Sequence, residues 1–97
     1  MSGHVFHTGH EELHGVTVVV ESPSGMTWVG RYHERTDRGV LLHDVATHDP
    51  ATSDQSRAAW IQRQLKFGVR IDQKHLTVPN PDAARIVRLA AWEPVSG

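Results

Sequence analysis

Histidine is the side chain that offers the most chemistry in this sequence. The 97 residues contain eight histidines, most of them in the first half of the chain. His7, His10 and His14 follow one another at spacings of three and four, which would put them along one side of a short helix. Two imidazoles one helical turn apart can chelate a transition metal, and Glu11 would add an oxygen ligand. His7, His10 and His14 are therefore the candidate metal ligands.

The histidines match no metalloenzyme motif, however. HExxH is absent, and a second pair, His43 and His48, is only flanked by Asp44 and Asp49. In a chain with little lysine, histidines also serve as solvent-facing polar groups, and this is the simpler interpretation. Protonation of clustered histidines at about pH 6 would loosen a helix or an interface. No cofactor is expected.

Catalytic patterns are missing from the sequence. No serine has a base partner at motif spacing, no glycine-rich phosphate loop occurs, and the adjacent Glu11 and Glu12 would point apart on a helix. The chain contains no cysteine, which excludes disulfides and thiolate metal sites. We therefore expect a binding protein and no enzyme.

Three consecutive strands are predicted in the first half of the chain. The run Val16–Glu21 is rich in β-branched residues, and Ser22–Gly25 supplies the proline and the glycine of a turn. The segment Met26–Glu34 alternates so that one face is buried, and Gly30 within it indicates a bulge or a sharp bend. A second polar turn leads into the strand Val40–Val45.

The order of these elements resembles the first sequence motif of Sm and Sm-like proteins. In that motif an apolar strand, a turn glycine, a bend glycine and an aliphatic third strand recur at the spacing of Val16–Val20, Gly25, Gly30 and Gly39–Val45. The resemblance extends over residues 9–45. It implies a mainly β fold, a small five-stranded barrel made from one bent sheet, of the Sm-like and SH3-like kind. It also implies a short helix before the first strand, for which residues 8–15 supply a capping box and a stopping glycine.

A helix is expected between the third and fourth strands. Ala58, Ile61 and Leu65 recur at helical spacing in the segment Ser53–Lys66, and Gly68 would end the helix. In Sm-like proteins this connection varies most in length, so the fold would tolerate an inserted helix there.

Two further strands should follow the inserted helix. Val69–Asp72 and His75–Val78 are either one long fourth strand or two pieces. Pro79–Asp82 is a tight turn, and Ala83–Trp92 is predicted as the fifth strand. The N-cap propensity of Asp82 and the alanine-rich composition leave a helix as the alternative for that last segment. Residues 1–97 would then form a single domain.

Sm-like proteins form closed rings in which the fourth strand of one subunit pairs with the fifth strand of the next. The resemblance thus implies that the chain associates with itself, because ring closure removes unpaired strand edges. Residues 1–54 carry three basic and eight acidic side chains, and residues 55–92 carry seven basic and two acidic ones. These opposite charges either attract across a head-to-tail interface or are simply solvated, and the sequence favours neither.

Single-stranded RNA is the ligand that the resemblance implies. In many Sm-like rings RNA lies against the loop between strands two and three and the loop between strands four and five. The corresponding residues here are 32–39 and 79–85, and an exposed tyrosine beside basic groups would stack on a base. The candidate RNA contacts are Tyr32, His33, Arg35, Asp37, Arg38, Asn80 and Arg85.

The loops also depart from the family pattern. The asparagine that reads a base edge is absent from Thr36–Gly39, and the second loop lacks the family's basic residue next to a glycine. The net charge is −1 at pH 7, so the chain as a whole lacks the electrostatic attraction that dominates non-specific binding. The alternatives are a scaffold or protein-interaction module of a larger assembly and a histidine-rich metal-binding module. The sequence shows no membrane-spanning run and no signal peptide, so we expect a cytoplasmic location.

Overall fold

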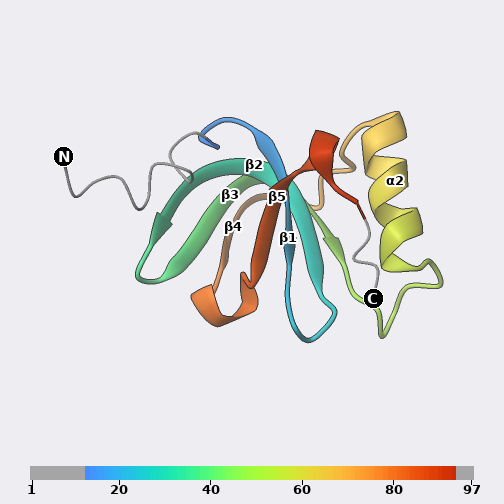
Figure 1. Cartoon of the computed structure of the whole chain (residues 1–97), viewed down its shortest axis with the longest axis horizontal. Coiled ribbons are helices and arrows are strands. Elements are labelled where there is room, and N and C mark those ends of the chain that lie inside the picture. The colour runs from blue at the N-terminus through green and yellow to red at the C-terminus, as the bar shows by residue number, and fades with distance from the viewer. Residues whose placement is uncertain (1–12, 94–97) are drawn as a thin grey trace.

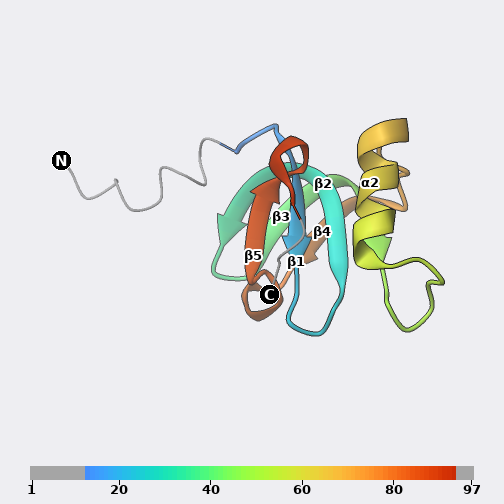
Figure 2. The same ribbon diagram turned by 45° about the vertical axis from the view of Figure 1, so that its right-hand side comes forward.

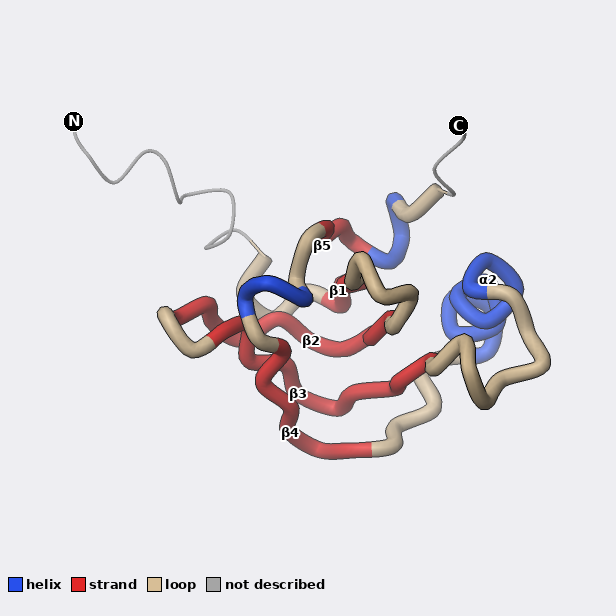
Figure 3. Tube along the Cα trace, turned by 90° about the horizontal axis from the view of Figure 1, so that it is seen from below, coloured by secondary structure: helices blue, strands red, loops and turns tan. Residues whose placement is uncertain are grey.

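A computed structural model describes residues 13–93, which form a curved antiparallel sheet with a helix beside it (Figures 1 and 2). The five strands lie in the order β4-β3-β2-β1-β5, so β4 and β5 are the two edges. Figure 3 shows the strands following one another in this order, with α2 to one side. The elements are β1 (Thr17–Glu21), β2 (Thr27–Thr36), β3 (Gly39–His48), α2 (Arg57–Phe67), β4 (Gln73–Val78), the 3₁₀ turn η2 (Asn80–Asp82), β5 (Arg85–Arg88) and the 3₁₀ turn η3 (Leu89–Ala91).

The strands β2 and β3 form the longest pair of the sheet, and their ladder is irregular at two points. From Val29 to Arg31 strand β2 advances two residues, whereas β3 advances three from Ala46 to His43. The extra residue places Asp44 in the left-handed region, with φ of 53°. A Cβ on Gly30 would lie 3.1 Å from the carbonyl oxygen of His43, so this position favours glycine. The predicted irregularity at Gly30 is confirmed.

Around β1 and the first half of β2 the sheet is buried on both faces, because it curves over one apolar cluster and is covered on the other side. Val18 and Val20 of β1 face the cluster that the curved strands enclose, together with Trp28, Tyr32 and Leu42. The intervening Val19 faces the opposite way. The second cluster comprises Val19, Val29, Ile61, Leu89 and Trp92.

The predicted helix is present and ends before Gly68 as expected, but α2 begins at Arg57, four residues later than the expected start at Ser53. Ser56 is the N-cap, and its side chain accepts a hydrogen bond from the backbone nitrogen of Ala59 at 3.1 Å. Gly68 follows the last turn with φ of 91°. The predicted buried face was partly wrong: Leu65 is 47% exposed, whereas Ile61 and Gln64 are buried. Gln64 belongs to the interior because its Oε1 accepts the backbone N–H of Arg70 at 2.9 Å.

The carboxylate of Glu21 joins four segments of the fold. Its Oε1 lies 2.9 Å from Arg57 Nη1 at the start of α2, and its Oε2 lies 2.9 Å from Arg85 Nη1 at the start of β5. The indole nitrogen of Trp92 donates to Oε2 at 2.7 Å. Arg57 also donates to Thr27 Oγ1 of β2. Acidic and basic residues from the two halves of the chain are thus paired within one subunit.

The fifth strand is shorter than the sequence predicts. Strand β5 comprises only Arg85–Arg88, and residues Leu89–Ala91 form a 3₁₀ turn that brings Trp92 to Glu21. The helix alternative for residues 83–92 is wrong, and so is the continuous strand. Strand β4 is a single piece, Gln73–Val78, preceded by irregular backbone.

The expected barrel is present only as a curved sheet, which is not closed between its edges β4 and β5. Most of the predicted N-terminal helix lies outside the described residues, and Leu13–Gly15 form a turn. In the described part of the chain, no helix has the length and apolar character needed to cross a membrane.

Replacement of Glu21 by alanine is expected to lower the free energy of unfolding by about 2–4 kcal/mol, because two guanidinium groups and an indole N–H lose their shared acceptor. The matched control is Arg31→Ala, which breaks the exposed ion pair with Asp44 and should cost less than about 1 kcal/mol. Urea unfolding of the two variants tests the difference. Equal losses would show that the Glu21 network is no stronger than a surface pair.

Candidate functional site

The two loops expected to form an RNA site are joined by hydrogen bonds. Arg35 Nε, near the end of β2, donates to Asn80 Oδ1 at 2.7 Å, and Asn80 Nδ2 donates to the carbonyl oxygen of Thr36 at 2.9 Å. Asn80 is the first residue of η2, which connects β4 to β5. The asparagine therefore fixes the β2–β3 turn against the β4–β5 connection.

Gly39 makes this close approach possible. Its φ is 143°, and a Cβ at this position would lie 2.1 Å from the carbonyl oxygen of Val78 and 3.0 Å from Cα of Pro79. Real Cβ atoms do not approach backbone atoms so closely. A side chain here would push the β2–β3 turn away from the β4–η2 connection, and Asn80 would then lose its partners.

The β2–β3 turn borders an open hollow of about 390 Å³. Asp37 and Arg38 lie at its rim and are exposed, and the backbone nitrogen of Arg38 donates to Thr36 Oγ1 at 3.1 Å. Arg38 offers a cation to a phosphate, and Asp37 offers an acceptor to a base edge. Such a wide, shallow surface suits an extended chain better than a small enclosed substrate.

Tyr32 and Arg85 do not belong to this surface. Tyr32 is only 3% exposed, too little for a base to stack on its ring, and burial raises the pKa of its hydroxyl. Arg35 opposes that rise in pKa, and Glu34 adds to it. Arg85 is held by Glu21 and by the carbonyl oxygen of Glu93. The expectation of an exposed tyrosine beside basic groups is corrected, because the inner face of β2 buries this side chain.

His33 instead belongs to a row of four imidazoles that crosses the sheet; we call His14, His33, His43 and His75 the histidine row. The ring centroids of successive members are 5.2, 4.7 and 4.7 Å apart. His14 Nδ1 lies 2.7 Å from the carbonyl oxygen of His33, and the Nδ1 atoms of His43 and His75 are 2.9 Å apart. Three members of the row, His14, His33 and His43, border a shallow hollow of about 330 Å³ that Arg31 also lines.

The row is made by strand register, which the sequence spacing did not reveal. His43 and His75 are opposite partners in the β3–β4 ladder, and His33 is the extra β2 residue between the pairs formed by Tyr32 and Glu34. The only signal in the sequence was the alternation of side chains between the two faces of each strand. That alternation does not predict which strands are neighbours, so it could not reveal the row.

The other candidate histidines lie elsewhere. His7 and His10 are outside the described residues, whereas His14 stands next to His33. His48 is buried, with Nε2 3.0 Å from the carbonyl oxygen of Gln55 and its ring 5.3 Å from that of Trp60. His48 therefore does not pair with His43. Within residues 13–93, no three histidine, aspartate or glutamate side chains are grouped as a metal site would require.

The pKa of His43 is lowered below its ordinary value. Desolvation is the largest cause, and the neighbouring His33, His75 and Arg31 add to it, since each disfavours a further positive charge. Asp44 acts in the opposite direction, and its carboxylate is paired with Arg31. At neutral pH the imidazole of His43 is consequently uncharged and retains a nitrogen lone pair.

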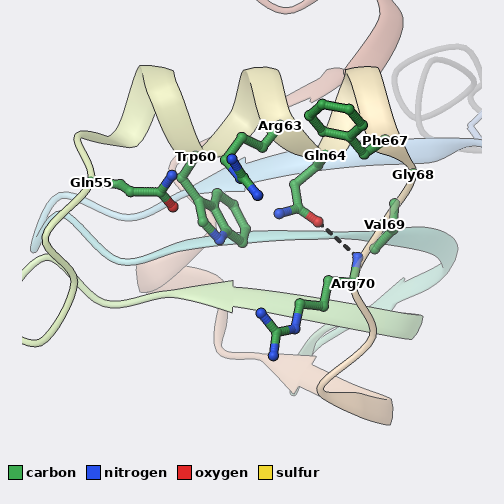
Figure 4. A pocket seen from close by; sticks show the side chains of 8 residues that line it. All are labelled: Gln55, Trp60, Arg63, Gln64, Phe67, Gly68, Val69 and Arg70. Carbon is green, nitrogen blue, oxygen red and sulfur yellow. Dashed lines mark hydrogen bonds between the residues drawn. The ribbon is translucent and has the colours of Figure 1, made fainter.

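A third hollow, of about 260 Å³, lies between α2 and the segment that follows it (Figure 4). Trp60 and Arg63 line it from the helix, and Arg70 lines it from the segment after Gly68. The hydrogen bond between Gln64 and the backbone of Arg70 joins the helix to this segment. Phe67 is 69% exposed at its edge, under the cations of Arg63 and Lys66.

Comparison with known proteins does not assign a family. No family model matches the chain, and no curated protein matches it. The joined loops and the histidine row are the features of the molecule from which a function can be inferred.

Replacement of Gly39 by alanine is expected to cost about 3 kcal/mol or more, because strain at positive φ adds to a collision with backbone atoms. Gly15→Ala is the matched control: its φ is also positive, 82°, but no atom lies within 4 Å of the added Cβ. That variant should lose only about 1–2 kcal/mol. Thermal unfolding of both variants measures the difference, and similar losses would contradict the close approach at Val78.

Proposed function

We propose that this protein is a non-catalytic, self-associating binding protein of the Sm-like kind, which holds single-stranded RNA against the joined β2–β3 and β4–β5 loops. The observation that carries the proposal is the pair of hydrogen bonds from Arg35 to Asn80 and from Asn80 to Thr36. They unite the two loops that the resemblance assigns to RNA. Arg38 adds a second exposed cation beside them.

The strand order supports self-association. Strands β4 and β5 are the sheet edges, and β4 is mostly exposed along its length. Pairing of β4 with β5 of a neighbouring subunit would satisfy the outer backbone groups of both strands and close the array. Side-chain charge adds no attraction at these edges, because Lys74 of β4 and Arg88 of β5 are both cationic. Backbone hydrogen bonds therefore drive the association.

A scaffold or protein-interaction module without RNA binding is the second candidate. Its support is the burial of Tyr32 together with the engagement of Arg85 by Glu21, which removes two of the expected RNA contacts. Both candidates would self-associate through the edges β4 and β5. RNA binding alone separates them.

Light scattering on the purified chain should give an integral multiple of 10.8 kDa greater than one. In the same sample, labelled oligo-uridine should bind at low salt, and its affinity should fall as salt rises. Arg38→Ala should weaken binding and reduce the salt slope by about 0.7 for each phosphate that is no longer neutralised. Arg63→Ala, on exposed α2 away from the loops, is the charge-matched control and should bind as the native chain does.

An assembly that binds no oligo-uridine would exclude RNA and leave the scaffold. A monomer would contradict the edge-pairing argument, whether or not RNA binds. Equal effects of Arg38→Ala and Arg63→Ala would mean that RNA binds by general charge and not at the β2–β3 turn.

A further inference from the structure

Two members of the histidine row face each other across the β3–β4 pair. His43 and His75 are directly opposite partners in the antiparallel register. Their rings meet edge to face, with planes at 84°, and their Nδ1 atoms are 2.9 Å apart. Two ring nitrogens at this distance cannot both carry a proton and cannot both present a bare lone pair, so one Nδ1–H donates to the other Nδ1. A metal ion bound by both nitrogens would replace that single proton.

The same spacing matches the bite of a chelated metal ion. An imidazole nitrogen binds Zn²⁺ at about 2.0–2.1 Å, so two nitrogens at right angles on one ion are about 2.8–3.0 Å apart, and about 3.3–3.4 Å apart at a tetrahedral angle. The observed 2.9 Å between the Nδ1 atoms falls in the first range. Right-angle pairs of ligands are typical of tetragonal Ni²⁺ and Cu²⁺, whereas tetrahedral Zn²⁺ would require the two nitrogens to separate by about 0.4 Å.

We propose that His43 and His75 form a two-histidine chelate, through their Nδ1 atoms, for a divalent late first-row transition-metal ion such as Zn²⁺, Ni²⁺ or Cu²⁺. Imidazole is a preferred ligand for this class of ion. Water completes the coordination shell, because residues 13–93 place no third ligand with the pair.

The surroundings of the pair leave it accessible to a metal ion, which binds imidazole only in its neutral form. Arg31, the cation opposite His43, is paired with the carboxylate of Asp44, which reduces repulsion of an incoming ion. His75 is exposed and His43 is half-buried, so the ion and its waters have access from solvent.

His33 supports this arrangement without joining it. Its ring meets that of His43 edge to face at 4.7 Å, on the side of His43 away from His75. The Nδ1 pair involves His43 and His75 alone. His33 therefore restricts the ring of His43 by packing, and it offers a matched control within the same row.

Zn²⁺ titration by calorimetry tests the chelate, in the native chain and in a full-length variant whose His4, His7 and His10 are replaced by asparagine. The variant removes binding by the N-terminal imidazoles, and it should still take up one ion per chain. On that background, His43→Ala and His75→Ala should each weaken binding by at least about tenfold, the smallest loss typical even for an outer partner of a metal ligand. His33→Ala should weaken it by less than either change.

Ring ¹⁵N chemical shifts give a readout that general stability would not change. Zn²⁺ should shift the Nδ1 resonances of His43 and His75 and leave those of His48 in place. Backbone amide spectra of each alanine variant establish that it is folded. Binding that survives His75→Ala in a folded protein, or an equal loss in His33→Ala, would overturn the two-histidine site.

Discussion

The buried carboxylate of Glu21 is the constraint on which the rest of the fold depends. A carboxylate that is largely removed from water costs several kcal/mol unless charged donors replace the water, and here the donors come from distant segments. Arg57 lies at the first turn of α2 and Arg85 at the start of β5. Ile61 of α2 is buried, and Ala58 and Trp60 pack beside it, so the position of α2 follows from this apolar packing together with the Arg57 contacts.

One part of the sheet is covered by other elements, and another part is not. The helix and the C-terminal turn cover the outer side of β1 and β2, where Val19, Val29 and Trp92 pack. The β2–β3 turn extends away from α2 in both views of the ribbon (Figures 1 and 2). There the side chains are polar and the surfaces are shallow, so this part of the sheet is available for ligands while the other part holds the fold together.

Sequence patterns predicted the features that depend on local chemistry. The β-branched run of β1, the irregularity at Gly30 and the end of α2 at Gly68 each follow from the conformational preferences of nearby residues. The short β5 could not be predicted in this way. The backbone leaves the sheet after Arg88 so that Trp92 can reach Glu21, and these two residues are 71 positions apart in the sequence. Periodicity contains no information about such a partner.

The histidine row escaped prediction for a related reason, yet it follows from the apolar core. Tyr32, Leu42 and Leu76 are neighbours on the inner face, where Tyr32 is opposite Leu42 and Leu42 is opposite Leu76. Since successive side chains alternate between faces, this pairing forces His43 and His75 together on the outer face. A slip of one residue between β3 and β4 would expose Leu76 and separate the imidazoles at once. Burial of the apolar core therefore fixes the strand register, and the register keeps the Nδ1 atoms of His43 and His75 close together without a metal ion.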